Sequence, residues 1–153
     1  SVVAYTVKGL VFEKLIKQLD LEKHLFLHAN VPNDQMAVYF SMIGESGGFL
    51  CSTSKVEGAP YSLLEAMSCK CPVLTTDSDG VRSSIIHNKT GKYYTLGDVT
   101  EAVKEAKELM TDSQLREKIR KDAFEHVKVN FNPDLYCVNF ISMIQSLGLN
   151  LSK

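Results

Sequence analysis

The sequence predicts an α/β fold, a single domain in which a parallel β-sheet carries helices on both faces and a helical extension follows at the C-terminus. Short apolar runs alternate with stretches of helical periodicity through the first two thirds of the chain, which is typical of strands joined by crossover helices. From about residue 100 onward the periodicity is helical only. A length of 153 residues is that of one domain with a sizeable core.

The first half of the chain yields three strands and two helices. The run Leu25-Phe26-Leu27 is uninterrupted by polar residues, which favours a parallel strand buried in a sheet. Asn33 or Asp34 can cap the helix that follows this strand. The expected elements, in order, are a strand at residues 2–5, a helix at 10–19, a strand at 25–27, a helix from 33 through 40 and a third strand, into which residues 47–51 lead.

The second half continues the alternation and then becomes helical. A turn at residues 77–80 separates a strand from a short helix. Charged residues from 101 to 128 are interpreted as solvated helix faces. The expected elements are a helix at 61–68, a strand at 72–76, a helix at 81–86, a strand at 92–94, and three helices capped by Thr100, by Asp112 or Ser113, and by Asn132 followed by Pro133.

Composition excludes several function classes. The formal net charge is −1, so we expect no broad electrostatic surface for nucleic acid or anionic membranes, and any phosphate must be held by a few placed donors. No apolar run is long enough to span a bilayer. Cys69 and Cys71 form a C-x-C pair that a metal could use, but no second pair completes a ligand set, which favours ordinary reduced thiols and a cytoplasmic protein.

The most informative stretch is residues 57–67, which reads EGAPYSLLEAM. Glu57 lies in a loop after a strand, and Glu65 stands eight positions later inside the next helix. Gly58 lets the backbone approach a ligand closely, and the first helical N–H groups face the edge of the sheet where α/β proteins bind anions. Carboxylates accept hydrogen bonds from sugar hydroxyls, so the pattern favours a nucleotide sugar. The alternative is that Glu65 is a surface residue and Glu57 a capping one.

The run from residue 54 to residue 74 resembles the E-x(7)-E signature of family 4 glycosyltransferases, the glycosyl transferases group 1. Thr76-Asp77, the turn at Asp79-Gly80 and the NKTG run at residues 88–91 follow the order and spacing of that family. The resemblance covers nearly the whole chain. It implies a Rossmann-like domain, specifically the C-terminal, donor-binding domain of a retaining enzyme with two such domains, the GT-B fold.

The resemblance also implies roles for individual residues. Glu57 would be the catalytic residue that orients the donor sugar, and Glu65 would accept hydrogen bonds from the nucleotide ribose. Backbone N–H groups of Ala59, Tyr61 and Ser62 would meet the sugar or diphosphate, while Pro60 shapes the turn. The donor-binding set is therefore Glu57, Gly58, Ala59, Pro60, Tyr61, Ser62 and Glu65. The loop beside the nucleotide base would be His28, Ala29, Asn30 and Val31.

By this resemblance the chain transfers a sugar from a nucleotide-diphosphate sugar to an unidentified acceptor (a glycan, lipid or protein) without a metal or other cofactor. Residues 1–153 would lack the domain's first strand–helix unit, which carries a basic pair in the family, and the N-terminal acceptor domain. We therefore expect no turnover by the chain alone. Lys70 and Ala29 occupy positions where the family usually has glycine.

Other functions fit the same pattern. The chain could be a subunit of a split enzyme or a non-catalytic nucleotide-sugar-binding module. A relation to sugar-nucleotide epimerases, which share the two-domain architecture, is less compatible with the E-x(7)-E spacing. A cytoplasmic location includes the cytosolic face of a membrane.

Overall fold

A computed structural model describes residues 2–5, 10–28, 30–56 and 58–147 of the chain. The chain divides into two compact units, Ser1–Met36 and Ala37–Lys153. The boundary falls inside helix α2 (Asn33–Glu45), which begins where the sequence predicts it and continues beyond Phe40. All three described strand pairs are parallel, which confirms the predicted α/β class with a parallel sheet.

The first unit contains a strand–helix–strand arrangement, with β1 (Val2–Tyr5), α1 (Leu10–Gln18) and β2 (Leu25–His28). The two strands pair in parallel, with Val2 opposite Leu25. The predicted burial of the second strand is wrong, because Phe26 is 55% exposed and Leu27 is 50% exposed. A sheet of two strands with one connecting helix has too few elements to cover both of its faces.

The second unit is built on a three-stranded sheet in the order β3-β4-β5. Its strands are β3 (Leu50–Ser52), β4 (Val73–Thr76) and β5 (Lys92–Tyr94). All four residues of the central strand β4 are buried. The carboxyl ends of the three parallel strands meet at one edge of the sheet, and four of the residues predicted to bind the donor, Glu57 to Pro60, follow β3 in the sequence.

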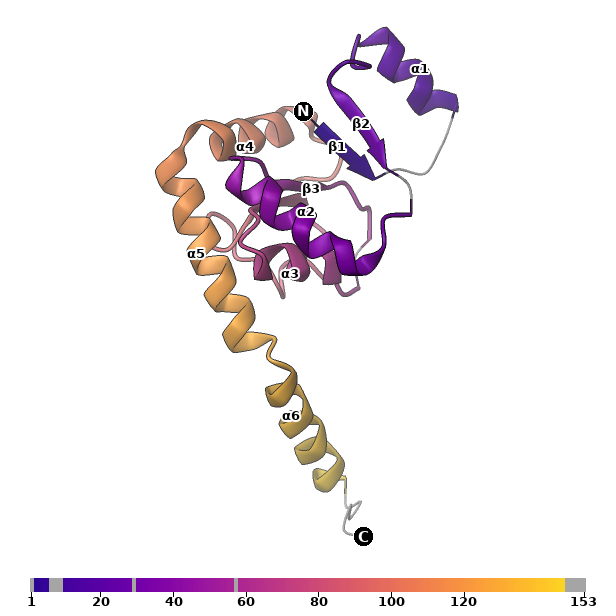
Figure 1. Cartoon of the computed structure of the whole chain (residues 1–153). Helices are drawn as coiled ribbons and strands as arrows, with labels where there is room; N and C mark the ends of the chain where they lie inside the picture. Colours follow the sequence, from indigo (N-terminus) through magenta and orange to yellow (C-terminus); the bar gives the residue numbers. More distant parts are fainter. Residues whose placement is uncertain (1, 6–9, 29, 57, 148–153) are drawn as a thin grey trace. The chain divides into compact units, whose positions relative to one another are not determined.

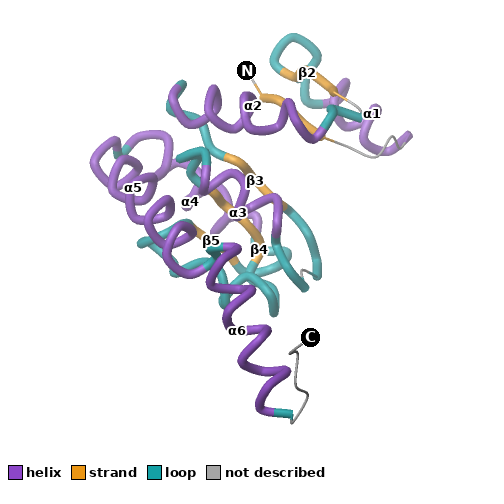
Figure 2. Tube along the Cα trace, turned by 60° about the horizontal axis from the view of Figure 1, so that its bottom comes forward, coloured by secondary structure: helices purple, strands orange, loops and turns teal. Residues whose placement is uncertain are grey.

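Three helices pack around this sheet: α3 (Tyr61–Ser68), α4 (Val99–Thr111) and α5 (Ser113–Asn130). Figure 2 shows the short strands enclosed by these helices. A buried cluster joins Leu74 and Tyr94 of the sheet to Leu109 of α4 and Ile119 of α5. Helix α3 packs against α5 and against β3 and β4, so its orientation is set by the core of this unit.

Among the three C-terminal helices, α4, α5 and α6, one capping residue differs from the sequence prediction. Asp98, rather than Thr100, caps α4, because its extended backbone lets its carboxylate accept from Glu101 N–H at 2.9 Å. Thr100 lies in the first turn of the helix. The other two predictions are confirmed, since Asp112 accepts from Leu115 N–H and Asn132 accepts from Asp134 N–H.

The short helix predicted at residues 81–86 is also wrong, because this segment forms consecutive turns. Val81 N–H donates to Ser78 O and Ile85 N–H donates to Val81 O, which begins a helical turn. The next N–H, that of Ile86, donates to Thr90 Oγ1 at 2.8 Å. A side chain thus takes the donor that a continuing helix needs, and the turn ends there.

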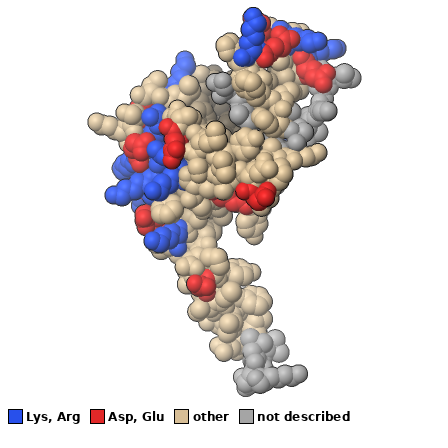
Figure 3. All heavy atoms as spheres, viewed as in Figure 1, with Lys and Arg blue, Asp and Glu red and all other residues tan. Residues whose placement is uncertain are grey.

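Helix α6 (Pro133–Ser146) follows α5 (Figure 1). Most of its apolar side chains are exposed. None of its residues is buried, and Tyr136 is 71% exposed. Asp134 is its one charged residue, so the helix is almost free of the blue and red atoms that mark α4 and α5 in Figure 3. Within the described part of the chain, no helix combines the length and the apolar character needed to cross a bilayer.

The C-terminal end of α3 is closed by a residue in the left-handed backbone region. Lys70, at a position where the family resemblance expects glycine, has φ of 56°. Cys71 N–H donates to Ala66 O, and Arg120 Nε donates to Lys70 O at 2.8 Å. This is the arrangement in which glycine commonly ends a helix, so the sequence departure does not change the geometry.

We expect Lys70→Gly to raise the free energy of unfolding by about 0.5–1 kcal/mol. Relief of the left-handed strain outweighs the greater freedom of glycine in the unfolded chain and the loss of the Lys70 ammonium from the Phe124 ring, 5.0 Å away. Asn88 is the control, because its φ is 60° but its Oδ1 accepts from Lys92 Nζ at 2.7 Å. Urea unfolding should show Asn88→Gly to be destabilised; equal changes in the two variants would contradict this account.

Candidate functional site

The two faces of α3 have different environments. Leu63, Ala66 and Met67 are fully buried and attach the helix to the core. Tyr61, Ser62 and Glu65 lie on the exposed face, where the side chain of Tyr61 is 71% exposed. Spacings of three and four residues place each set on one side of a helix, so burial of the apolar set presents the polar set to solvent.

The N-terminus of α3 has an available backbone donor. Pro60 is the N-cap residue; it is buried and makes no side-chain capping hydrogen bond. Tyr61 N–H donates to Ala59 O, and Leu63 and Leu64 N–H both donate to Pro60 O. Among the described residues, Ser62 N–H has no hydrogen-bond partner. Of the N–H groups expected to meet a ligand, that of Tyr61 is already used, whereas that of Ser62 is available to an anion.

The β3–α3 loop (residues 53–60) leads from the sheet edge to this helix. A Cβ placed on Gly58 would have no atom within 4 Å, so the backbone there borders open space. The hydroxyl of Thr76, at the end of β4, donates to Ser54 O and attaches the start of the loop to the sheet. Glu57, predicted to be the catalytic residue, lies outside the described residues. Glu65 is one helical turn into α3 and exposed.

The adjacent loop, which leaves β4, contains an ion pair that the sequence does not reveal. Arg82 Nε donates to Asp77 Oδ1 at 2.8 Å, and a second guanidinium nitrogen contacts Asp77 Oδ2. The hydrogen bond from Arg82 lowers the pKa of Asp77 below its ordinary value. The Arg82 side chain is 68% exposed and lies over the Tyr93 ring. This places an oriented cation on a loop at the same sheet edge as the start of α3.

The residues predicted to border the nucleotide base belong to the first unit. His28 is the last residue of β2, Asn30 has a left-handed φ of 55°, and Val31 is partly buried. Ala29 lies outside the described residues. A left-handed asparagine two positions after a strand end turns the chain sharply, as expected of a loop at the carboxyl edge of a parallel strand.

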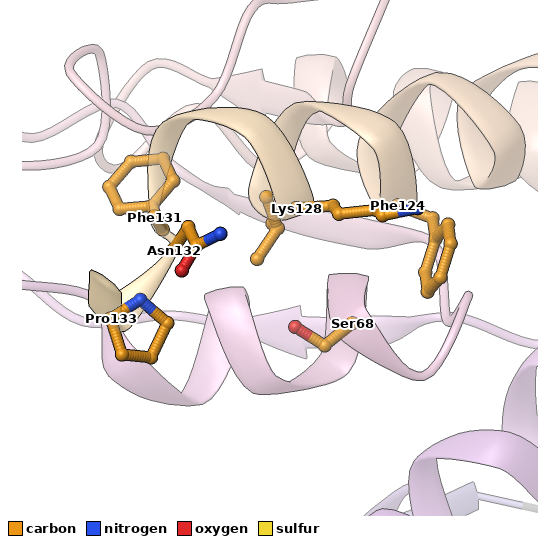
Figure 4. A pocket seen from close by; sticks show the side chains of 7 residues that line it. Ser68, Phe124, Lys128, Phe131, Asn132 and Pro133 are labelled. Carbon is orange, nitrogen blue, oxygen red and sulfur yellow. The ribbon is translucent and has the colours of Figure 1, made fainter. Parts of the chain in front are cut away.

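A hollow of about 340 Å³ lies at the other end of α3 (Figure 4). Phe124, Val127, Phe131 and Pro133 give it an apolar lining, and Ser68 contributes from the last turn of α3. It therefore lies at the helix C-terminus, away from the open donor of Ser62. An anion is favoured at the N-terminal end of a helix, so this hollow is not the candidate site.

The family model for glycosyl transferases group 1 matches residues 8–126, which include the β3–α3 loop and all of α3. The chain belongs to the glycosyl transferases group 1 family.

Two curated relatives agree with this assignment. A Xenopus tropicalis "glycosyltransferase 1 domain-containing protein 1" is 32% identical over 101 residues, which cover 66% of this chain and 29% of the relative. An "N-acetyl-alpha-D-glucosaminyl L-malate synthase" of Bacillus anthracis is 30% identical over 122 residues, which cover 79% of this chain and 30% of the relative. The chain thus spans about 30% of the length of these relatives.

Three solved structures share the fold of this chain. A sucrose-phosphate synthase from Thermosynechococcus elongatus matches with a TM-score of 0.80 and 18% identity, over 95% of this chain and 38% of that one. The C-terminal domain of a glycosyl transferase group 1 family protein from Francisella tularensis matches with a TM-score of 0.71 and 22% sequence identity. The match covers 84% of this chain and 66% of that one. Anabaena HepE in complex with UDP-glucose matches with a TM-score of 0.77 and 18% sequence identity. The match covers 89% of this chain and 36% of that one. The predicted Rossmann-like fold, that of one domain of the GT-B architecture, is therefore confirmed.

Proposed function

We propose that this group 1 chain is the donor-binding half of a retaining glycosyltransferase that takes its sugar from a nucleotide-diphosphate sugar. The observation that carries the proposal is the exposed start of α3, where Ser62 N–H has no partner among the described residues and Glu65 is exposed one turn later. Family membership and the UDP-glucose complex of a protein with the same fold support the nucleotide sugar as ligand.

The proposed chemistry uses position and charge. An unpaired N–H at the start of a helix favours the diphosphate, whose negative charge grows as the sugar departs. Glu65 would hold the ribose through its carboxylate, and Glu57 would orient the sugar for attack on the same face that the diphosphate leaves. The acceptor would be supplied by a second domain or chain. We expect binding and transfer to need no divalent metal, which a chelator would test directly.

We expect Glu65→Ala to weaken nucleotide-sugar binding roughly ten-fold or more, because hydrogen bonds to a charged group contribute about 1.5–3 kcal/mol. Ligand-observed NMR can measure this by titration of UDP, GDP, ADP and their glucose conjugates, since it detects millimolar binding. Glu125→Ala is the matched control: Glu125 is also a helical, exposed glutamate, and it lies on α5.

Three results would contradict the proposal in different ways. Absence of binding by every nucleotide and nucleotide sugar would remove the donor-binding function from the chain. Equal binding by Glu65→Ala and Glu125→Ala would keep nucleotide binding but remove Glu65 from it. Binding by a chain that stays inactive with every acceptor domain of its own organism would favour the non-catalytic module over the transferase.

A further inference from the structure

Two adjacent threonines at the end of β4 have buried hydroxyls with different partners. Thr75 is 0% exposed and Thr76 is 1% exposed, and successive side chains of a strand point to opposite faces. Thr75 Oγ1 lies 3.5 Å from Thr76 O, within its own strand. Thr76 Oγ1 instead donates to Ser54 O, which lies 22 positions earlier in the chain, in the β3–α3 loop. The second hydroxyl therefore joins two separate segments.

The β3–α3 loop has few other attachments. Of its described residues from 53 to 58, Ser54 is the one whose backbone takes part in a hydrogen bond. The far end of the loop is fixed by Pro60, which is buried and whose carbonyl accepts from Leu63 and Leu64 N–H. The loop is thus held at two points, Ser54 and Pro60. The residues between these points border open space at Gly58.

We propose that Thr76 is a positioning residue for the donor substrate: its hydroxyl holds the β3–α3 loop in the conformation that receives the sugar diphosphate. This proposal rests on the proposed function of the site. Thr76 acts through Ser54 and is itself buried, so it does not contact the ligand. Its position in the central strand of the sheet gives the loop a rigid support, because β4 is paired on both sides, to β3 and to β5.

The test compares Thr76→Val with Thr75→Val. Valine keeps the shape of threonine and removes the hydroxyl, and both positions are equally buried, so the two variants should lose similar amounts of stability. We expect Thr76→Val to weaken UDP-glucose binding roughly three- to ten-fold, the effect of one lost hydrogen bond. Thr75→Val should bind within about two-fold of the wild type, and Thr76→Ser, which keeps the hydroxyl, should restore binding.

A second readout separates positioning from general destabilisation. UMP lacks the donor sugar and the second phosphate. Its affinity should therefore be nearly equal in Thr76→Val and Thr75→Val, whereas the affinity for UDP-glucose should differ between them. Equal UDP-glucose affinities in the two valine variants, with wild-type binding intact, would overturn the positioning role and leave the proposed function standing.

If the wild-type chain binds no nucleotide sugar, the proposed function fails, and the loop attachment is tested without ligand. Hydrogen exchange at the amides of Tyr61, Leu63 and Leu64, which donate to Ala59 O and Pro60 O at the far end of the loop, should then accelerate in Thr76→Val and not in Thr75→Val, because only the first variant frees the loop. Unchanged exchange in Thr76→Val would show that its hydroxyl does not hold the loop.

Discussion

Replacement of Lys92 by methionine is expected to lower the free energy of unfolding by about 3–5 kcal/mol. Lys92 is on β5 and is 0% exposed, yet its ammonium contacts Glu105, Glu108 at 2.7 Å and Asn88 at 2.7 Å. Burial alone would lower the pKa of Lys92, but its two carboxylate partners raise it above the ordinary value. Without the ammonium, the buried Glu105 retains a charge that has lost its principal partner.

Lys104→Met is the matched control for this prediction. Lys104 also faces Glu105, at 3.8 Å, but its side chain is 70% exposed. An exposed pair contributes little, so this variant should change stability by less than about 0.5 kcal/mol. The double variant Lys92→Met/Glu105→Leu should recover much of the loss, since it removes both buried charges. Urea unfolding measures all three, and no recovery in the double variant would show that the cost lies in packing rather than charge.

The second large effect is expected at Gly91, where alanine should cost about 1–3 kcal/mol. A Cβ at this position would lie 2.6 Å from Val73 Cγ2 and 2.9 Å from Ile85 Cγ2. Both contacts are methyl groups of β-branched side chains, which have few alternative rotamers. The backbone at Gly91, or the segments that carry Val73 and Ile85, must therefore shift to admit the new methyl group.

Gly58→Ala provides the comparison, because a Cβ there meets no atom within 4 Å. Its stability, measured by urea unfolding, should stay within about 0.5 kcal/mol of the wild type. The pair Gly91→Ala and Val73→Ala should couple favourably, since the second substitution removes the methyl group that the first one meets. Additive losses in this double variant would place the strain at Ile85 or in the backbone.

The sequence predicted the order of the elements because that order depends on local patterns. The apolar runs at residues 2–5, 25–27 and 72–76 mark strands β1, β2 and β4, with ends displaced by at most one residue. The motif at residues 57–67 placed α3 correctly because proline and the apolar spacing define its start and its buried face. The chain's family follows from that same motif.

What the sequence did not predict depends on contacts between distant residues. The pattern of charges from 101 to 128 predicts solvated side chains, which is wrong for Glu105 because Lys92, 13 positions earlier, enters the same buried site. A lysine in a short strand with two tyrosines gives no sign of burial. The pair Asp77 and Arg82 is equally hidden, since five positions in a loop correspond to no regular spacing. The ligand-binding roles predicted for the site residues remain predictions, and Glu57 and Ala29 also lie outside the described residues.

Helix α3 begins without a side-chain cap and ends in a turn whose Glu65, Ala66 and Met67 carbonyls accept hydrogen bonds. A bound diphosphate would therefore complete the helix itself, as a serine or aspartate cap does in other helices. Folding and ligand occupancy are then linked by mass action, and a ligand at 100 times its dissociation constant adds about 2.7 kcal/mol to the stability of the fold. Under the proposed function, the melting temperature of the chain would rise with the concentration of nucleotide sugar, and cells short of the donor would hold this domain closer to its unfolding threshold.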